Sequence, residues 1–199
     1  MQPKITRLLQ DGITLGPLRT DEEAIGKYME WMNDETITHW LGRNTIVTQW
    51  KDEEQWAEKE HPYTFSIYIQ NPPTHIGTCA ITLNKTGITA DLGICIGVDE
   101  VRGKGIGRTV IQMLTRYAFN ELRVHRCTIS LNADNERALR CYLAAGYKEC
   151  GREHEDIFHN GKYSDTLHLE MLEQDFRKWE KQNRKKDTGK ENRTRRINK

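Results

Sequence analysis

The chain has few of the residues and runs that mark a metal-binding, secreted or membrane protein. Its five cysteines, at positions 79, 95, 127, 141 and 150, form no Cys-x-x-Cys pair, so we expect reduced, mostly buried thiols and no metal site. No apolar run approaches the ~20 residues that cross a membrane. The first residues, Met-Gln-Pro-Lys-Ile, lack the apolar core of an export signal. We therefore expect a cytoplasmic protein with no membrane partner.

Internal repeats and a long linker are also missing, and 199 residues are enough for one domain with its own core. Charge is unevenly distributed. The segment from Arg177 onward has 11 Lys or Arg and three Asp or Glu, a net charge of +8, whereas the first 176 residues carry −7. We predict one domain over 1–176, followed by a basic C-terminal helix and mobile tail over 177–199. Such a tail suits weak contact with RNA or the ribosome, although a solvated extension is the more common explanation.

Three alternating glycines lie in the sequence Arg102-Gly-Lys-Gly-Ile-Gly107. Residues 90–98 before them have the short apolar form of a buried strand, and apolar residues recur at helical spacing from 106 to about 120. Glycines before a helix let the backbone approach an anion, which the free N–H groups of the first helical turn can bind. The pattern favours a phosphate cradle of a cofactor, with candidate residues Arg102, Gly103, Lys104, Gly105, Ile106, Gly107 and Arg108.

Other interpretations of this hexapeptide remain open. A flexible strand-to-helix turn explains the six residues about equally well by themselves, because short glycine motifs recur by chance. A P-loop does not fit, since Lys104 is followed by Gly105 and not by Ser or Thr. A Rossmann site fits poorly, because its Gly-x-Gly-x-x-Gly spacing is absent.

A second motif follows the next predicted strand, residues 126–132. Asn135 is a good N-cap and Gly146 a good residue just beyond the end of a short helix. Together the two segments resemble the signatures of the GNAT superfamily of acetyl-CoA-dependent N-acetyltransferases, Arg/Gln-x-x-Gly-x-Gly/Ala and Asn-x-x-Ala-x-x-x-Tyr-x-x-x-Gly-aromatic. The matching residues are Arg102, Gly105 and Gly107 for the first, and Asn135, Ala138, Tyr142, Gly146 and Tyr147 for the second.

The resemblance covers roughly residues 5 to 176. Segments 117–126 and 155–165 are similar to the RimJ/RimL-type branch, which includes ribosomal-protein N-terminal acetyltransferases and, in a related group, spermidine N-acetyltransferases. The family's fold is mixed α/β, with a central, mostly antiparallel sheet, one splayed pair of strands and flanking helices.

The residue pattern agrees with such a fold. We expect strands near 13–18, 63–69, 76–83, 90–98, 126–132, 148–158 and 162–172, with Asn160-Gly161 turning the last hairpin. The run Thr20-Asp-Glu-Glu23 has the form of a capping box and predicts a helix that begins there.

The resemblance also implies where the donor binds. In the family the pantetheine arm of acetyl-CoA enters the splay, which on this sequence would lie near Ile96, Gly97 and Val98. Backbone groups there would pair with the arm, and an N–H would polarise the thioester carbonyl. Asn135 would contact the arm, cap its helix, or do both.

The chemistry that the resemblance implies is direct attack of a primary amine on acetyl-CoA in a ternary complex. Tyr142 matches the family's general-acid position, and a core tyrosine is the alternative. Asp91 stands where the RimJ/RimL-type branch often has a Glu, so it is the candidate base, although it is shorter by a methylene. A solvated or structural Asp91 is the competing interpretation. The rival bases are Glu153, His154 and Glu155.

The acceptor stays open between a protein N-terminal amine and a small amine. Residues from about 33 to 60 and the hairpin around Asn160 are expected to select it. The acidic body suits a cationic acceptor of either kind. The alternative class of function is a non-catalytic acetyl-CoA sensor or a ribosome-associated binding module, and a homodimer is a further state that one sequence does not decide.

Overall fold

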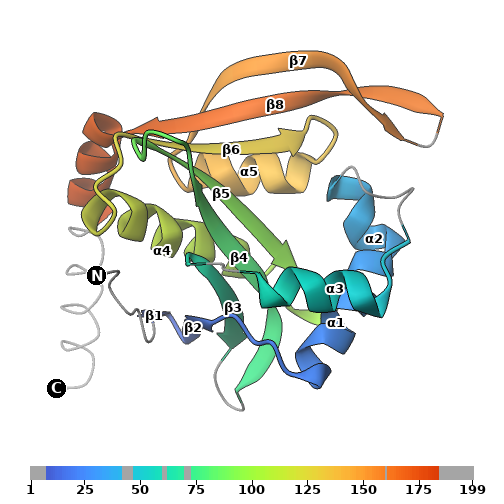
Figure 1. Cartoon of the computed structure of the whole chain (residues 1–199). Helices are drawn as coiled ribbons and strands as arrows, with labels where there is room; N and C mark the ends of the chain where they lie inside the picture. Colours follow the sequence, from blue (N-terminus) through green and yellow to red (C-terminus); the bar gives the residue numbers. More distant parts are fainter. Residues whose placement is uncertain (1–7, 42–46, 60–61, 70–72, 160, 184–199) are drawn as a thin grey trace, which may run out of the picture.

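The computed structural model describes residues 8–41, 47–59, 62–69, 73–159 and 161–183. Eight strands form one sheet in the order β1-β2-β3-β4-β5-β6-β8-β7 (Figure 1). Among the described strands, β5 and β6 make the single parallel pair, so the predicted mixed, mostly antiparallel sheet is confirmed. The strands are β1 (Leu8–Gln10), β2 (Ile13–Pro17), β3 (Thr64–Ile69), β4 (Thr74–Leu83), β5 (Thr89–Ile96), β6 (Arg126–Asn132), β7 (Lys148–His159) and β8 (Lys162–Leu172).

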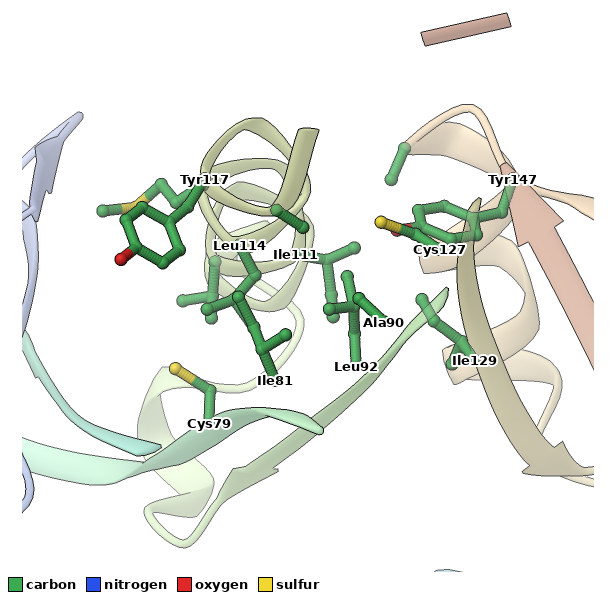
Figure 2. Close-up of a cluster of buried hydrophobic side chains, with 14 of the residues drawn as sticks. Cys79, Ile81, Ala90, Leu92, Ile111, Leu114, Tyr117, Cys127, Ile129 and Tyr147 are labelled. Carbon is green, nitrogen blue, oxygen red and sulfur yellow. The ribbon is translucent and has the colours of Figure 1, made fainter. Parts of the chain in front are cut away.

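Helices cover the sheet (Figure 1). They are α1 (Glu22–Asn33), α2 (Glu35–Thr38), α3 (Trp50–Glu58), α4 (Ile106–Asn120) and α5 (Glu136–Ala144), with single 3-10 turns at His39–Leu41 and Asp99–Val101. The apolar face of α4, including Ile111 and Leu114, is fully buried against the sheet, as its helical spacing predicted. Figure 2 shows these side chains meeting Ile81, Leu92 and Ile129 from three strands. Among the described helices, none is long and apolar enough to cross a membrane.

Of the two helix N-caps predicted from the sequence, one is confirmed and the other is wrong. Asn135 caps α5 as predicted, because its Oδ1 accepts the N–H of Ala138 at 3.0 Å. The capping box at Thr20 is wrong: α1 begins at Glu22 with Asp21 as N-cap, whose carboxylate accepts the N–H of Ala24 at 3.3 Å. Arg19 donates to Asp21 at 2.7 Å and holds that carboxylate in place. A contact from Arg19, which lies just before the motif, therefore favours Asp21 over Thr20 as the cap.

The strands β5 and β6 begin as neighbours and then separate. Their register pairs Thr89 with Arg126, Ala90 with Cys127 and Asp91 with Thr128, and extends no further. Beyond that point β5 follows β4 to Ile96, while β6 follows β8 to Asn132. The predicted splay is therefore present, and it begins earlier along β5 than the expected position near Ile96.

The chain after β8 continues as a helix over residues 173–183. Trp179 stacks near Phe176 with ring centroids 6.0 Å apart, and the Arg116 guanidinium lies 5.1 Å from the Trp179 ring. Residues past 176 thus pack against the domain. The remaining predictions for the basic tail, for Asn160 and for residues 42–46 lie outside the described residues.

Candidate active site

A cavity of about 680 Å³ opens where β5 and β6 separate. Residues 92–96 of β5 and 129–131 of β6 form two of its walls. Residues 101–108, which lead into α4, close one end, and α5 contributes Ala138, Cys141 and Tyr142. The two sequence motifs therefore line one cavity, although a whole helix and a strand separate them along the chain.

The glycine segment has the geometry of an anion cradle. Gly103 and Gly105 have φ of +75° and +83°, which L side chains rarely adopt, and Gly105 is the N-cap of α4. The first N–H groups of a helix have no partner within the helix, so those of α4 are available to an anion at this end of the cavity. Lys104 and Arg108 line the cavity and form no ion pair within the part of the chain that the structure describes. These residues fit a pyrophosphate.

The Arg102 side chain, in contrast to those of Lys104 and Arg108, is bonded to the protein's own backbone. Its Nε and Nη2 donate to the carbonyl oxygen of Ile96 at 3.0 and 2.9 Å, and its guanidinium pairs with Asp99. The Arg102 side chain is only 13% exposed. It holds the end of β5 against the loop that leads to α4, whereas its direct contact with a cofactor stays a prediction.

The three predicted positions at the splay are not equivalent. The N–H of Gly97 already donates to the carbonyl of Ile76 at 2.9 Å. Because backbone groups alternate in direction along a strand, those of Ile94 and Ile96 face away from β4, toward the open side. A Cβ at Gly97 would lie 2.0 Å from the indole of Trp31, so this glycine makes room for Trp31. Ile96 and Val98 pack against the main core.

Two tyrosines of the second motif have different surroundings. Tyr142 is partly buried, lines the cavity, and its hydroxyl has no hydrogen bond to any described residue. Burial raises its pKa above the ordinary value of 10.0. Tyr147 is buried in the core, where its hydroxyl lies 2.8 Å from Thr115 Oγ1. The structure therefore leaves Tyr142 available for chemistry and gives Tyr147 a structural partner.

Asp91 lies at the point where the strands part. Its carboxylate accepts a hydrogen bond from Thr128 Oγ1 at 2.9 Å, and Asp91 is absent from the cavity walls that the described residues form. The side chain is exposed, yet the surrounding sheet removes part of its water and raises the pKa of the carboxyl. Of the rival bases, His154 Nδ1 lies 3.3 Å from Asp165, and Glu155 has a φ of 53° in an irregular stretch of β7.

A polar group on the same face of the sheet as Asp91 was not predicted from the sequence. Ser130 of β6 lines the cavity, and its Oγ lies 2.9 Å from Nδ1 of His168 on β8. Nε2 of His168 lies 2.7 Å from Oε1 of Glu153 on β7. No motif joins these residues, because strand pairing alone brings them together. The alternation of polar Thr128 and Ser130 with apolar neighbours on β6 was the available signal.

Comparisons with known proteins agree with the geometry. A family model described as "Acetyltransferase (GNAT) domain" matches residues 13–148. "Putative ribosomal N-acetyltransferase YdaF" of Bacillus subtilis is 30% identical over 161 residues, covering 80% of this chain and 82% of that protein. Spermidine N(1)-acetyltransferase of Vibrio cholerae is 30% identical over 96 residues, and this match covers 48% of this chain and 55% of that protein.

Solved structures show the same fold. The crystal structure of spermidine N-acetyltransferase from Vibrio cholerae in complex with CoA and spermine has a TM-score of 0.74 at 22% identity, and the match covers 84% of this chain and 99% of that one. The family model spans most of the chain, and the cavity between β5 and β6 carries both motifs. The chain therefore belongs to the GNAT family of acetyltransferases, enzymes whose donor is acetyl-CoA.

Proposed function

We propose that this enzyme acetylates a primary amine by direct attack on acetyl-CoA in a ternary complex. The observation that carries the proposal is the cavity that both motifs line. The Tyr142 hydroxyl lies in its wall with no hydrogen bond to the residues that the structure describes. The acceptor is a protein N-terminal amine or a small amine such as a polyamine. One relative of the chain is named for spermidine, and another is named a putative ribosomal N-acetyltransferase.

The donor end of the cavity binds through backbone groups and charge. The first-turn N–H groups of α4, with Lys104 and Arg108, hold the pyrophosphate. The backbone groups of Ile94 and the N–H of Ile96 pair with the pantetheine arm, because the Ile96 carbonyl is already bonded to Arg102. Acetyl-CoA supplies the activated thioester carbon. Binding both substrates in one cavity removes much of the entropic barrier to their reaction.

Tyr142 acts at the departing sulfur. Because its pKa is raised, the phenol keeps its proton throughout the physiological pH range and can donate a hydrogen bond to the sulfur. A phenol is a weaker acid than a thiol, so complete proton transfer is uphill. Stabilisation of the negative charge that develops on sulfur is therefore the larger part of its contribution.

Asp91 helps to attract the acceptor amine to the cavity. Its exposed carboxylate lies beside the opening, and the first 176 residues carry a net charge of −7. Both features attract a cationic amine to this face of the enzyme. Asp91 does not line the cavity, so we assign it to attraction of the amine and look elsewhere for the proton acceptor.

Thiol release from acetyl-CoA tests the proposed function. The full chain would be assayed with polyamines, amino sugars, aminoglycosides and basic N-terminal peptides. We expect one acceptor class to give turnover, and Tyr142→Phe to lower kcat by about 10²- to 10⁴-fold with an unchanged Kd for acetyl-CoA. Tyr147→Phe is the matched control.

The control variant separates chemistry from folding. Tyr147→Phe should lose about 1 kcal/mol of unfolding free energy with its hydrogen bond to Thr115, and should keep its turnover per folded molecule. Unchanged turnover in Tyr142→Phe would show that the assigned role is wrong. Acetyl-CoA binding without turnover of any acceptor would point to a sensor of acetyl-CoA.

A further inference from the structure

We propose that Ser130, His168 and Glu153 form the route by which the acceptor ammonium loses its proton. The inference rests on the proposed function and assigns the base that it requires. The three side chains come from the neighbouring strands β6, β8 and β7. The Ser130 hydroxyl contacts the acceptor amine, and His168 accepts the proton that Ser130 passes on.

The register of the sheet brings the three residues together. Ser130 is paired with His168 across β6 and β8, and Glu153 is paired with Thr166, which lies two residues before His168 on the same face. The contacts are short, at 2.9 Å from Ser130 Oγ to His168 Nδ1 and 2.7 Å from His168 Nε2 to Glu153 Oε1. His168 is one-third exposed, so an acceptor can shield it from water on binding.

An opening leads from this group into the cavity. Asp91 and Thr128 are the last paired residues of β5 and β6, and the next positions on the same face are Gly93 and Ser130. Both line the cavity, and a Cβ at Gly93 would meet nothing within 4 Å. The space in front of the Ser130 hydroxyl is therefore open, whereas the Asp91 carboxylate is bonded to Thr128 outside it.

The contacts set the direction of proton movement. The carboxylate of Glu153 can only accept, so Nε2 of His168 carries the hydrogen in that bond and Nδ1 is left to accept from the Ser130 hydroxyl. An oxygen lone pair of Ser130 then faces the ammonium. As the N–H bond breaks, Ser130 Oγ takes that proton and passes its own to Nδ1. The amine lone pair is freed for attack, and the imidazolium that forms is paired with Glu153.

Other charged and titratable groups surround His168. From β5 comes Asp91, on whose carboxyl His168 acts electrostatically. From β6 comes Arg126, which pairs at 2.8 Å with Glu170 of β8. From β7 comes Cys150, whose Sγ donates to the carbonyl of His168 at 3.3 Å. Arg126 is thus neutralised by Glu170, and the carboxylate in direct contact with the imidazole is that of Glu153.

The test is the pH profile of kcat/KM, measured from pH 6 to 10 with the best acceptor. His168→Asn keeps an amide oxygen that can accept from Ser130 but cannot take a proton. We expect kcat/KM to fall by about 10²-fold at pH 7 and the deficit to shrink as pH nears the amine's own pKa, where the amine arrives already deprotonated. Ser130→Ala should show the same pH-dependent recovery, and Glu153→Gln a smaller loss. His125→Asn, at an exposed histidine just before β6 and outside the route, is the control.

Three results would overturn the relay. One is turnover in His168→Asn and Ser130→Ala equal to that of the parent enzyme. Another is a loss that is the same at every pH, since a structural defect would not respond to the protonation of the amine. The third is an acetyl group on Ser130 in the intact mass, which would make Ser130 a nucleophile. Absence of turnover in the parent enzyme would instead overturn the proposed function, and the relay with it.

Discussion

The guanidinium of Arg102 binds the protein's own backbone. Two hydrogen bonds to the Ile96 carbonyl and an ion pair with Asp99 place it under the end of β5. A planar guanidinium can make both bonds to one oxygen, whereas an ammonium is a point charge with no such fork. At the scale of single residues, the shape of the donor cavity therefore depends on the geometry of this side chain as well as on its charge.

Replacing Arg102 by Lys should weaken acetyl-CoA binding nearly as much as replacing it by Ala, by about tenfold, because both variants lose the paired bonds. Isothermal titration with acetyl-CoA measures the change, and Lys85→Ala on the exposed β4–β5 turn is the control. If Arg102→Lys instead binds acetyl-CoA as tightly as the parent enzyme does, then Arg102 contributes only its positive charge, which attracts the phosphates of the donor.

At the scale of elements, α1 and β5 meet at a position that admits no side chain. Trp31 of α1 packs beside Tyr28 with ring centroids 5.8 Å apart, and its indole lies over Gly97. A Cβ at Gly77, which is paired with Ile96, would lie 2.1 Å from the carbonyl oxygen of Cys95. The end of β5 is thus held by close backbone contacts with β4 on one side and by α1 on the other.

We expect Gly97→Ala to lower the free energy of unfolding by about 1–3 kcal/mol, because its Cβ would overlap Trp31 and force the indole to move. Gly93→Ala, on β5 four residues before Gly97, is the matched control, since its Cβ meets nothing within 4 Å. Urea unfolding of both variants gives the comparison. Equal stabilities would show that Trp31 relocates without loss of packing.

At the scale of the whole molecule, a buried histidine lies beside the smaller of two apolar clusters. The larger cluster lies between α4, α5 and the sheet, and the smaller one gathers Ala24, Tyr28, Trp31 and Ile37. His75 lies against Tyr28 and Trp31, donating from Nε2 to the Gly77 carbonyl at 3.1 Å in the tautomer that this contact requires. Its buried Nδ1 has no partner among the described residues. The packing of α1 on the sheet therefore requires a neutral imidazole.

The pH dependence of stability should report this burial. Burial lowers the pKa of His75 from 6.5 to about 4, so between these values the unfolded chain binds the proton more readily than the folded one. The free energy of unfolding should fall, by up to about 3 kcal/mol, as pH drops through this window. Urea unfolding at pH 4.5, 5.5, 6.5 and 7.5 measures it, and His75→Gln should flatten the slope. An unchanged slope in that variant would assign the effect to other groups.

The carboxylate of Asp21 titrates at lower pH than His75. The Arg19 guanidinium lowers the pKa of Asp21 to about 2, so the stability that this ion pair gives the folded chain is lost as pH falls from about 4 to about 2.

The helix over residues 173–183 belongs to the same packed unit. Arg177 donates to Asn120 at 2.6 Å, and Trp179 covers Gly146 beyond the end of α5. A chain that ends at 183 should unfold at the same temperature as the full chain. One that ends at 176 should lose about 2 kcal/mol with these contacts. Thermal unfolding distinguishes them, and equal stability of both would support a domain boundary at 176.

Local patterns predicted much of the fold. The face of α4 and the strand ranges followed from apolar periods of 3.6 and 2, and Asn135 as a cap followed from the residue type. The start of α1 was misplaced because Arg19 stabilises Asp21 as the cap. For Arg102, residue type and motif position predicted a phosphate contact. Its actual partner depends on how the loop after β5 folds back.

The sequence by itself determined the family and the two segments that build the donor cavity, because glycine conformation, helix starts and apolar periodicity are encoded within a few neighbouring residues. Tertiary structure alone decided that β5 and β6 part after Asp91, that Asp91 stays outside the cavity, and that Ser130, His168 and Glu153 meet. Strand register is set by how distant apolar side chains fill a common core. Contacts between polar side chains on separate strands follow from that packing and leave no local pattern in the sequence.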